Sequence, residues 1–161
     1  MDATPQNANA RARRWAWAWL SLTTAFGLHV IDEAAHGFLQ WYNPTVLNLR
    51  ERIGWFPMPT FERHVWLAGL VTAVLVLFAL TPVVARGRRW MVPVAYIYAS
   101  IHIVNGLGHL GWSTATRQWI PGVLSSPLLL LAGAWLLIAT GRMLRRADAP
   151  RRPGTPMDRV R

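Results

Sequence analysis

Two stretches of this sequence place ionisable or hydrogen-bonding side chains in otherwise apolar surroundings. The first runs from His29 to His36 and contains Asp32 and Glu33, and the second runs from His102 to His109 and contains an asparagine. Insertion scales put the cost of a charged side chain at mid-membrane at about 2.5–3.5 kcal/mol, so such groups commonly face a protein interior and mark a function. These two stretches therefore form the candidate site.

Each stretch forms a single stripe if it is helical. In the first stretch the polar residues are spaced i, i+3, i+4 and i+7, and in the second i, i+3 and i+7. Both spacings place the side chains on one face of an α-helix. Counted at about 1.5 Å per residue from Trp15 and Trp90, the two stripes reach the same depth. We expect them to face each other across a shared pocket.

Imidazole and carboxylate side chains at such a pocket predict a divalent metal ion. The chain has no cysteine, so its metal ligands must be nitrogen and oxygen, which suit zinc, iron or manganese. We predict Asp32 to orient a histidine from behind the ligands. The predicted metal ligands are His29, Glu33, His36, His102 and His109, and the predicted catalytic residues are Glu33, His29 and Asn105.

The same residues allow two other interpretations. Buried carboxylates and imidazoles could transfer protons to and from a substrate without a metal. They could also only hydrogen-bond one another and hold the helices together. The matched depth of six such groups argues against packing alone, because their desolvation is costly. The spacing does not distinguish metal-dependent from metal-free catalysis.

The elements that must position these residues are four long apolar blocks, at residues 15–41, 65–85, 90–112 and 123–143. Each is long enough to span a hydrocarbon core of about 30 Å. The fold class we predict is all-α, a four-helix transmembrane bundle at residues 15–146, with a short interfacial helix between the first two spans, in the segment 42–64. Pro121 and Gly122 are expected to start the last helix.

The basic residues predict the orientation of this bundle in the cell membrane. All seventeen are arginine, giving a net charge of +10, and they cluster before the first block, between the second and third, and after the fourth. The positive-inside rule then places both termini in the cytoplasm. Residues 1–14 and the basic tail 147–161 are expected to be disordered. The partners we expect are membrane lipids and not nucleic acid, because no nucleic-acid motif accompanies the arginines.

These observations favour an enzyme that acts on a lipid-like or small apolar substrate. A proton or cation transporter and a structural membrane subunit are the alternatives. The inner halves of the four blocks lack ionisable groups, so the sequence shows no continuous polar path across the membrane.

Several elements resemble those of the HXXEE-domain family, small multi-pass membrane proteins named for a His-x-x-Glu-Glu motif. Here the motif reads His29-Val-Ile-Asp-Glu33, with Asp32 where the family name has the first Glu. Asn105, His109 and the run Ile120-Pro-Gly-Val-Leu-Ser125 are similar to later elements of the family. The similarity spans roughly residues 20–140. It implies a membrane protein and supports the candidate site, but it supplies no activity.

Overall fold

The computed structural model describes residues 5–144, and this part of the chain is all-helical, as predicted. No strand occurs among these residues. Five helices follow one another along the chain: α1 (Pro5–Ala35), α2 (Phe38–Ile53), α3 (Arg63–Ala85), α4 (Met91–Thr116) and α5 (Ser126–Leu144).

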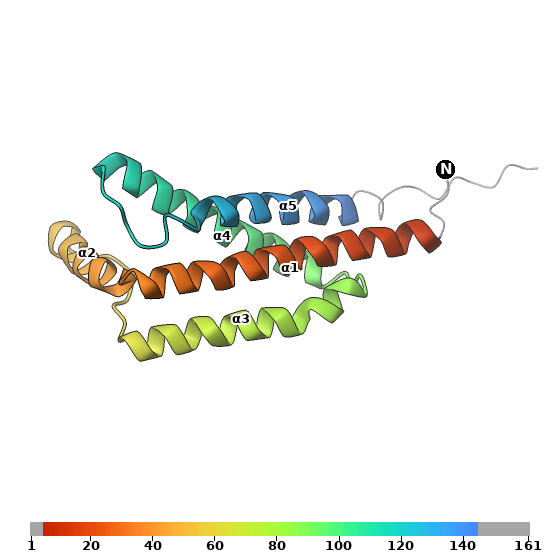
Figure 1. Ribbon diagram of the computed structural model, residues 1–161, viewed down its shortest axis with the longest axis horizontal. Helices are drawn as coiled ribbons and strands as arrows, with labels where there is room; N and C mark the ends of the chain where they lie inside the picture. The colour runs from red at the N-terminus through yellow and green to blue at the C-terminus, as the bar shows by residue number, and fades with distance from the viewer. Residues whose placement is uncertain (1–4, 145–161) are drawn as a thin grey trace, which may run out of the picture.

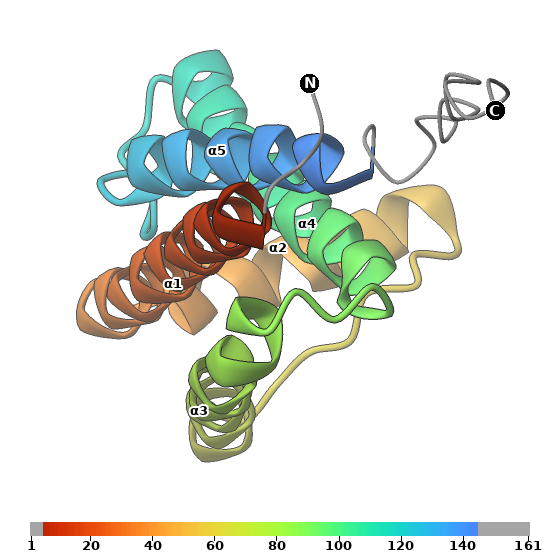
Figure 2. The same ribbon diagram turned by 90° about the vertical axis from the view of Figure 1, so that its right-hand side faces the viewer.

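Helix α1 lies in the middle of the bundle. Helices α3 and α5 run alongside parts of it on opposite sides, α4 crosses behind it, and α2 lies at one end (Figure 1). Helix α5 packs against both α1 and α4, so it joins the two helices that carry the candidate site (Figure 2, seen from the end where α1 begins). The backbones of the two site helices approach each other closely at fewer points than either approaches α5, and the two helices meet mainly through their side chains.

Two buried tryptophans fix the position of α1. The indole nitrogen of Trp15 donates to Thr140 Oγ1 on α5 at 2.9 Å, and that of Trp19 donates to the Leu77 carbonyl on α3 at 2.9 Å. A buried indole N–H needs a partner, so each bond favours one rotation of α1 about its axis. This rotation turns the face that carries His29 toward the interior, where its ring is fully buried.

Three of the helices, α3, α4 and α5, are long and apolar enough to cross a membrane. Their outward faces carry large apolar side chains, including Leu75, Val104 and Leu131, each more than half exposed. An apolar surface of this extent is typical of contact with lipid. Four spans were predicted, and the crossing of the membrane by α1 stays a prediction.

The first apolar block is not one continuous helix. Gly37 adopts a left-handed conformation with φ 74°, which ends α1 at Ala35 and turns the chain into α2. Residues 38–41, predicted to belong to the first span, therefore begin the short helix that follows it. A helix does precede α3 as predicted, but it begins at Phe38, and its position in the membrane interface stays a prediction.

The two terminal segments that were predicted to be disordered are described to different extents. Residues 5–14, which were expected to be disordered, form the first turns of α1. Alanine and arginine are among the best helix formers, so the polar composition of this segment indicates exposure to solvent without opposing a helix. The predicted disordered tail at 147–161 lies outside the described residues.

The last helix begins later than Pro121-Gly122 predicted. Gly122 has φ 89° and lies in a turn, and α5 starts at Ser126. The connection from α4 to α5 folds back toward α1 (Figure 1). It thereby brings residues 120–125 over the two site helices.

Candidate functional site

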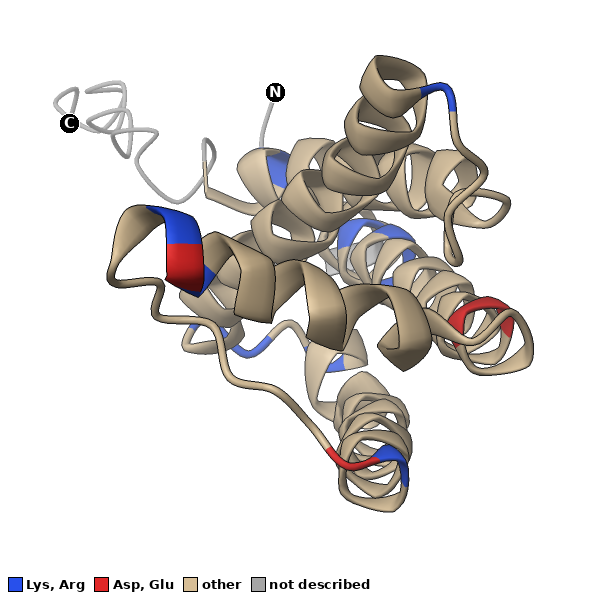
Figure 3. Ribbon diagram, turned by 90° about the vertical axis from the view of Figure 1, so that its left-hand side faces the viewer, with Lys and Arg blue, Asp and Glu red and all other residues tan. Residues whose placement is uncertain are grey.

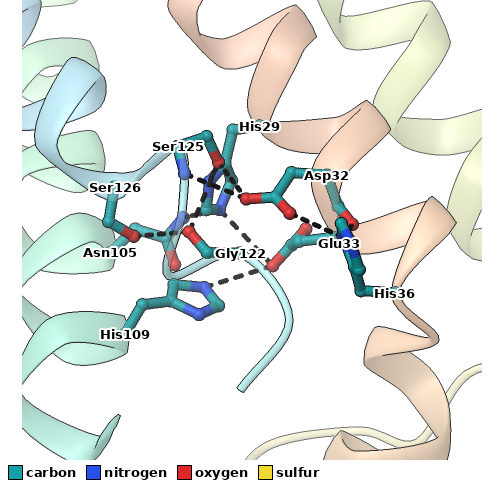
Figure 4. Close-up of polar contacts among 9 residues, drawn as sticks. All are labelled: His29, Asp32, Glu33, His36, Asn105, His109, Gly122, Ser125 and Ser126. Carbon is teal, nitrogen blue, oxygen red and sulfur yellow. Dashed lines mark hydrogen bonds and ion pairs between the residues drawn. The ribbon is translucent and has the colours of Figure 1, made fainter. Parts of the chain in front are cut away.

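Three side chains that can bind a metal meet where the end of α1 approaches α4. His29, Glu33 and His109 are each at least nine-tenths buried, and one ligand atom from each lies within 4.8 Å of the other two. Glu33 Oε1 is 3.4 Å from His29 Nε2 and 3.2 Å from His109 Nε2, so the carboxylate lies between the two imidazoles (Figure 4). The predicted meeting of the two stripes is confirmed for these three residues.

A chain of hydrogen bonds behind His29 decides which of its nitrogens carries a proton. Asp32 Oδ2 accepts from the backbone nitrogen of Ser125 at 2.9 Å and from its hydroxyl at 2.7 Å. The hydroxyl has only one proton, so at its 2.8 Å contact with His29 Nδ1 the imidazole must donate. A neutral His29 is therefore protonated at Nδ1 and has an unshared pair at Nε2.

This tautomer creates an electrostatic conflict in the centre of the site. Asn105 Nδ2, 3.0 Å from His29 Nε2, donates to the unshared pair. Glu33 Oε1 lies 3.4 Å from His29 Nε2. An ionised carboxylate has no proton to donate, so two electron-rich atoms then face each other in a buried space. A cation between them, either a proton or a metal ion, removes the repulsion.

His109 is incompletely satisfied by the protein. Its Nδ1 is buried and has no hydrogen-bond partner in the described part of the chain. The ring lies edge-on to His29 with 4.9 Å between centroids, and Phe38 at the start of α2 covers another side. Most buried polar atoms are hydrogen-bonded, but the protein contacts this imidazole only through its other nitrogen, Nε2, which faces Glu33.

Gly122 holds the connection before α5 directly against both imidazoles. A Cβ atom at this position would lie 2.7 Å from His109 Cε1 and 2.9 Å from His29 Cε1. Its positive φ also disfavours any other residue. The Ser126 hydroxyl donates to the Gly122 carbonyl at 2.7 Å, which keeps the turn in place (Figure 4).

Two predicted ligands lie outside this group of three. His36 points away from it, half-exposed, with Nδ1 2.8 Å from Asp32 Oδ1. His102 is buried, but its Nδ1 contacts the Tyr98 carbonyl at 2.9 Å and its ring packs on Phe26. Seven residues of helix place His102 about 10 Å from His109 along α4, which is too far for one ion. The structure therefore brings together three of the five predicted ligands.

Asp32 and Asn105 lie beside the group of three. Asp32 contacts His36 directly and reaches His29 through Ser125, so its place behind a ligand agrees with the orienting role that was predicted for it. Asn105 contacts His29 Nε2, one of the two imidazole nitrogens that face Glu33. The catalytic roles assigned to Glu33, His29 and Asn105 stay predictions.

The comparison with known families identifies the family of this chain. The model of a family described as a protein of unknown function with an HXXEE motif matches residues 14–136. The chain belongs to the HXXEE family. No curated protein and no solved structure matches it.

In this HXXEE protein the residues of the motif take different parts. The motif's histidine, His29, and its second acid, Glu33, belong to the group of three side chains that can bind a metal. Asp32, in the place of the first acid, instead contacts Ser125. The sequence had not assigned Ser125 or Gly122 to the site. Both lie in the run from Ile120 to Ser125, whose resemblance to the family was the signal that could have found them.

Proposed function

We propose that this HXXEE protein binds a divalent transition-metal ion through His29, Glu33 and His109 and is an enzyme acting on a lipid-like or small apolar substrate. The observation that carries the proposal is the placement of the Glu33 carboxylate between two buried imidazole nitrogens, His29 Nε2 and His109 Nε2. A positive ion satisfies all three atoms at once.

The distances between these atoms support a metal. Nitrogen and oxygen ligands bound at about 2.0–2.1 Å in a tetrahedron lie about 3.3 Å from one another. The two contacts of Glu33 Oε1, at 3.4 and 3.2 Å, are close to this separation. Two histidines and one carboxylate suit zinc or iron, and three protein ligands leave a fourth position for water or substrate.

A pocket next to Glu33 supplies the access that a substrate needs. It has a volume of about 340 Å³ and lies between the turn at residues 34–40 and the start of α3, where Arg63 and Trp66 line it. This volume is within the range of small-molecule sites. An apolar substrate with a polar end would place that end near Glu33 and Arg63, while its apolar part contacts the outward faces of the helices.

Each group around the metal would then have a separate role in the reaction. A metal held there supplies a Lewis acid that polarises an oxygen atom of the substrate or activates a water molecule. Asp32 and Ser125 keep the His29 proton on Nδ1, and Asn105, released from Nε2 when the ion binds, can donate to the substrate. Gly122 and its turn exclude water from the side of the two imidazoles.

The proposal is tested by lipid turnover with a metal requirement. The purified protein is incubated with a total membrane lipid extract, with and without added zinc or iron, and the lipids are compared by mass spectrometry. We expect a product that is lost on chelation and absent for Glu33→Gln. His64→Gln is the control, because His64 is exposed and outside the group. Turnover that survives both chelation and Glu33→Gln would refute a metal-dependent enzyme.

A further inference from the structure

The acidic residues among the described residues lie at one end of the bundle, whereas arginines occur at both ends. Its four acidic residues, Asp32, Glu33, Glu51 and Glu62, lie toward the α2 end, which faces the viewer in Figure 3. Within residues 5–144, the charged side chains of the opposite end are all basic and come from the start of α1, the α3–α4 connection and the end of α5: Arg11, Arg13, Arg14, Arg86, Arg88, Arg89 and Arg142. This end therefore attracts anions.

A cavity at the basic end gathers three of these arginines. It has a volume of about 520 Å³, lies between the start of α1 and the end of α5, and is lined by Arg11, Arg14 and Arg142 together with Trp15 and Trp135. None of the three guanidinium groups forms an ion pair with an acid among residues 5–144. Three positive charges around one cavity repel each other unless an anion lies between them.

The cavity has a fixed base and an apolar side. The bond between Trp15 and Thr140 joins its two walls, so the arginines of α1 and α5 are held on opposite sides. From its edge an apolar strip continues along α5 through Trp135, Leu131 and Ile138, which are 45%, 71% and 54% exposed. The site thus combines a basic cavity with a surface suited to hydrocarbon.

We propose that this cavity binds the phosphate-bearing headgroup of an anionic phospholipid, whose acyl chains lie along the strip on α5. Guanidinium groups bind phosphate oxygens in pairs, and tryptophan favours the level of the headgroups. Basic cavities between transmembrane helices recognise anionic headgroups in this way. The proposed lipid is separate from the proposed metal, because the two sites lie at opposite ends of α1.

The test measures lipid binding by purified protein in neutral detergent. Phosphatidylglycerol, phosphatidylcholine and inorganic phosphate are titrated separately, and bound ligand is counted by mass spectrometry of the intact protein. The double variant Arg14→Gln/Arg142→Gln removes two arginines from the cavity. Its control, Arg13→Gln/Arg88→Gln, removes the same charge from the same end, and neither residue lines the cavity.

We expect one phosphatidylglycerol per chain, with phosphatidylcholine at least about tenfold weaker. The cavity variant should weaken binding at least about tenfold and the control less than about threefold. Equal losses in the two double variants would overturn the proposal, because they would show attraction by net charge alone. Binding of inorganic phosphate as tight as that of the lipid would also overturn it, since the ligand would then be the free anion.

Discussion

His29 is the residue on which the chemistry of the site depends. Its Nδ1 faces a hydroxyl whose single proton is given to Asp32, and this arrangement fixes the tautomer. The sequence could predict that His29 and Glu33 share a helical face, because their spacing is i, i+4. It could not predict which nitrogen is protonated, because Ser125 is 96 residues away along the chain.

The first prediction concerns this hydrogen-bond chain. Ser125→Ala and Asp32→Asn should each weaken metal affinity about 10–100-fold, since groups that orient a ligand histidine commonly have effects of this size. Asp32→Glu keeps the carboxylate and restores the family motif, so it should retain most of the affinity. Competition titrations with a chelating dye measure all three. Affinity in Ser125→Ala equal to that of the unmodified protein would show that the hydroxyl does not set the tautomer.

The second prediction concerns Gly122. Gly122→Ala places a methyl group 2.7 Å from His109 Cε1 and strains a backbone with φ 89°, so we expect a loss of stability of about 1–3 kcal/mol and weaker metal binding. Gly108→Ala is the matched control, because no atom lies within 4 Å of the position that a Cβ atom would take there, and alanine favours a helix. Thermal unfolding in detergent that is the same for both variants would contradict the close packing of the turn.

At the scale of elements, side chains of α1 and α4 meet at several levels, from Trp19 and Tyr98 to Glu33 and His109. The sequence matched the depth of both stripes by assuming parallel helices, and this succeeded for His109. It failed for His102, because its ring packs on Phe26, three residues before His29, and its Nδ1 contacts the Tyr98 carbonyl. Helical periodicity defines which face is polar, but crossing angles follow from the packing of both helices on α5, which no local pattern specifies.

The third prediction tests how α1 is fixed. Trp15→Phe removes the bond to Thr140 and leaves that hydroxyl buried with a lost partner, so we expect destabilisation by about 1–3 kcal/mol. Trp17→Phe makes the same change two residues away on a side chain that is 58% exposed, and should alter stability by less than about 0.5 kcal/mol. Chemical denaturation followed by tryptophan fluorescence compares them. Similar midpoints would mean that the indole bond does not stabilise the bundle.

At the scale of the whole molecule, the separation of charge defines the orientation that we expect. One end of the described chain holds arginines without acids, and the other holds every acid of residues 5–144 together with the proposed metal site. The sequence predicted this asymmetry well, because arginine clusters at block edges are visible without coordinates. It did not predict the cavity between Arg14 and Arg142, which arises only when the start of α1 packs against the end of α5.

The fourth prediction follows from that orientation. The chain has no cysteine, so single cysteines can be introduced at two exposed asparagines, Asn7 and Asn48. A membrane-impermeant maleimide should label Asn48→Cys on intact cells and Asn7→Cys only after lysis, since the arginine-rich end is expected in the cytoplasm. The reverse pattern would place the His/Glu site on the cytoplasmic side.

The central claim is that His29, Glu33 and His109 bind one metal ion, and X-ray absorption spectroscopy of the zinc-loaded protein tests it most directly. We predict about one ion per chain, with nitrogen and oxygen ligands at about 2.0–2.1 Å and the outer-shell scattering of two imidazoles. Glu33→Gln should lose the ion, and His64→Gln should keep it. A protein that takes up no metal, or whose bound metal shows no imidazole ligands, would contradict the account.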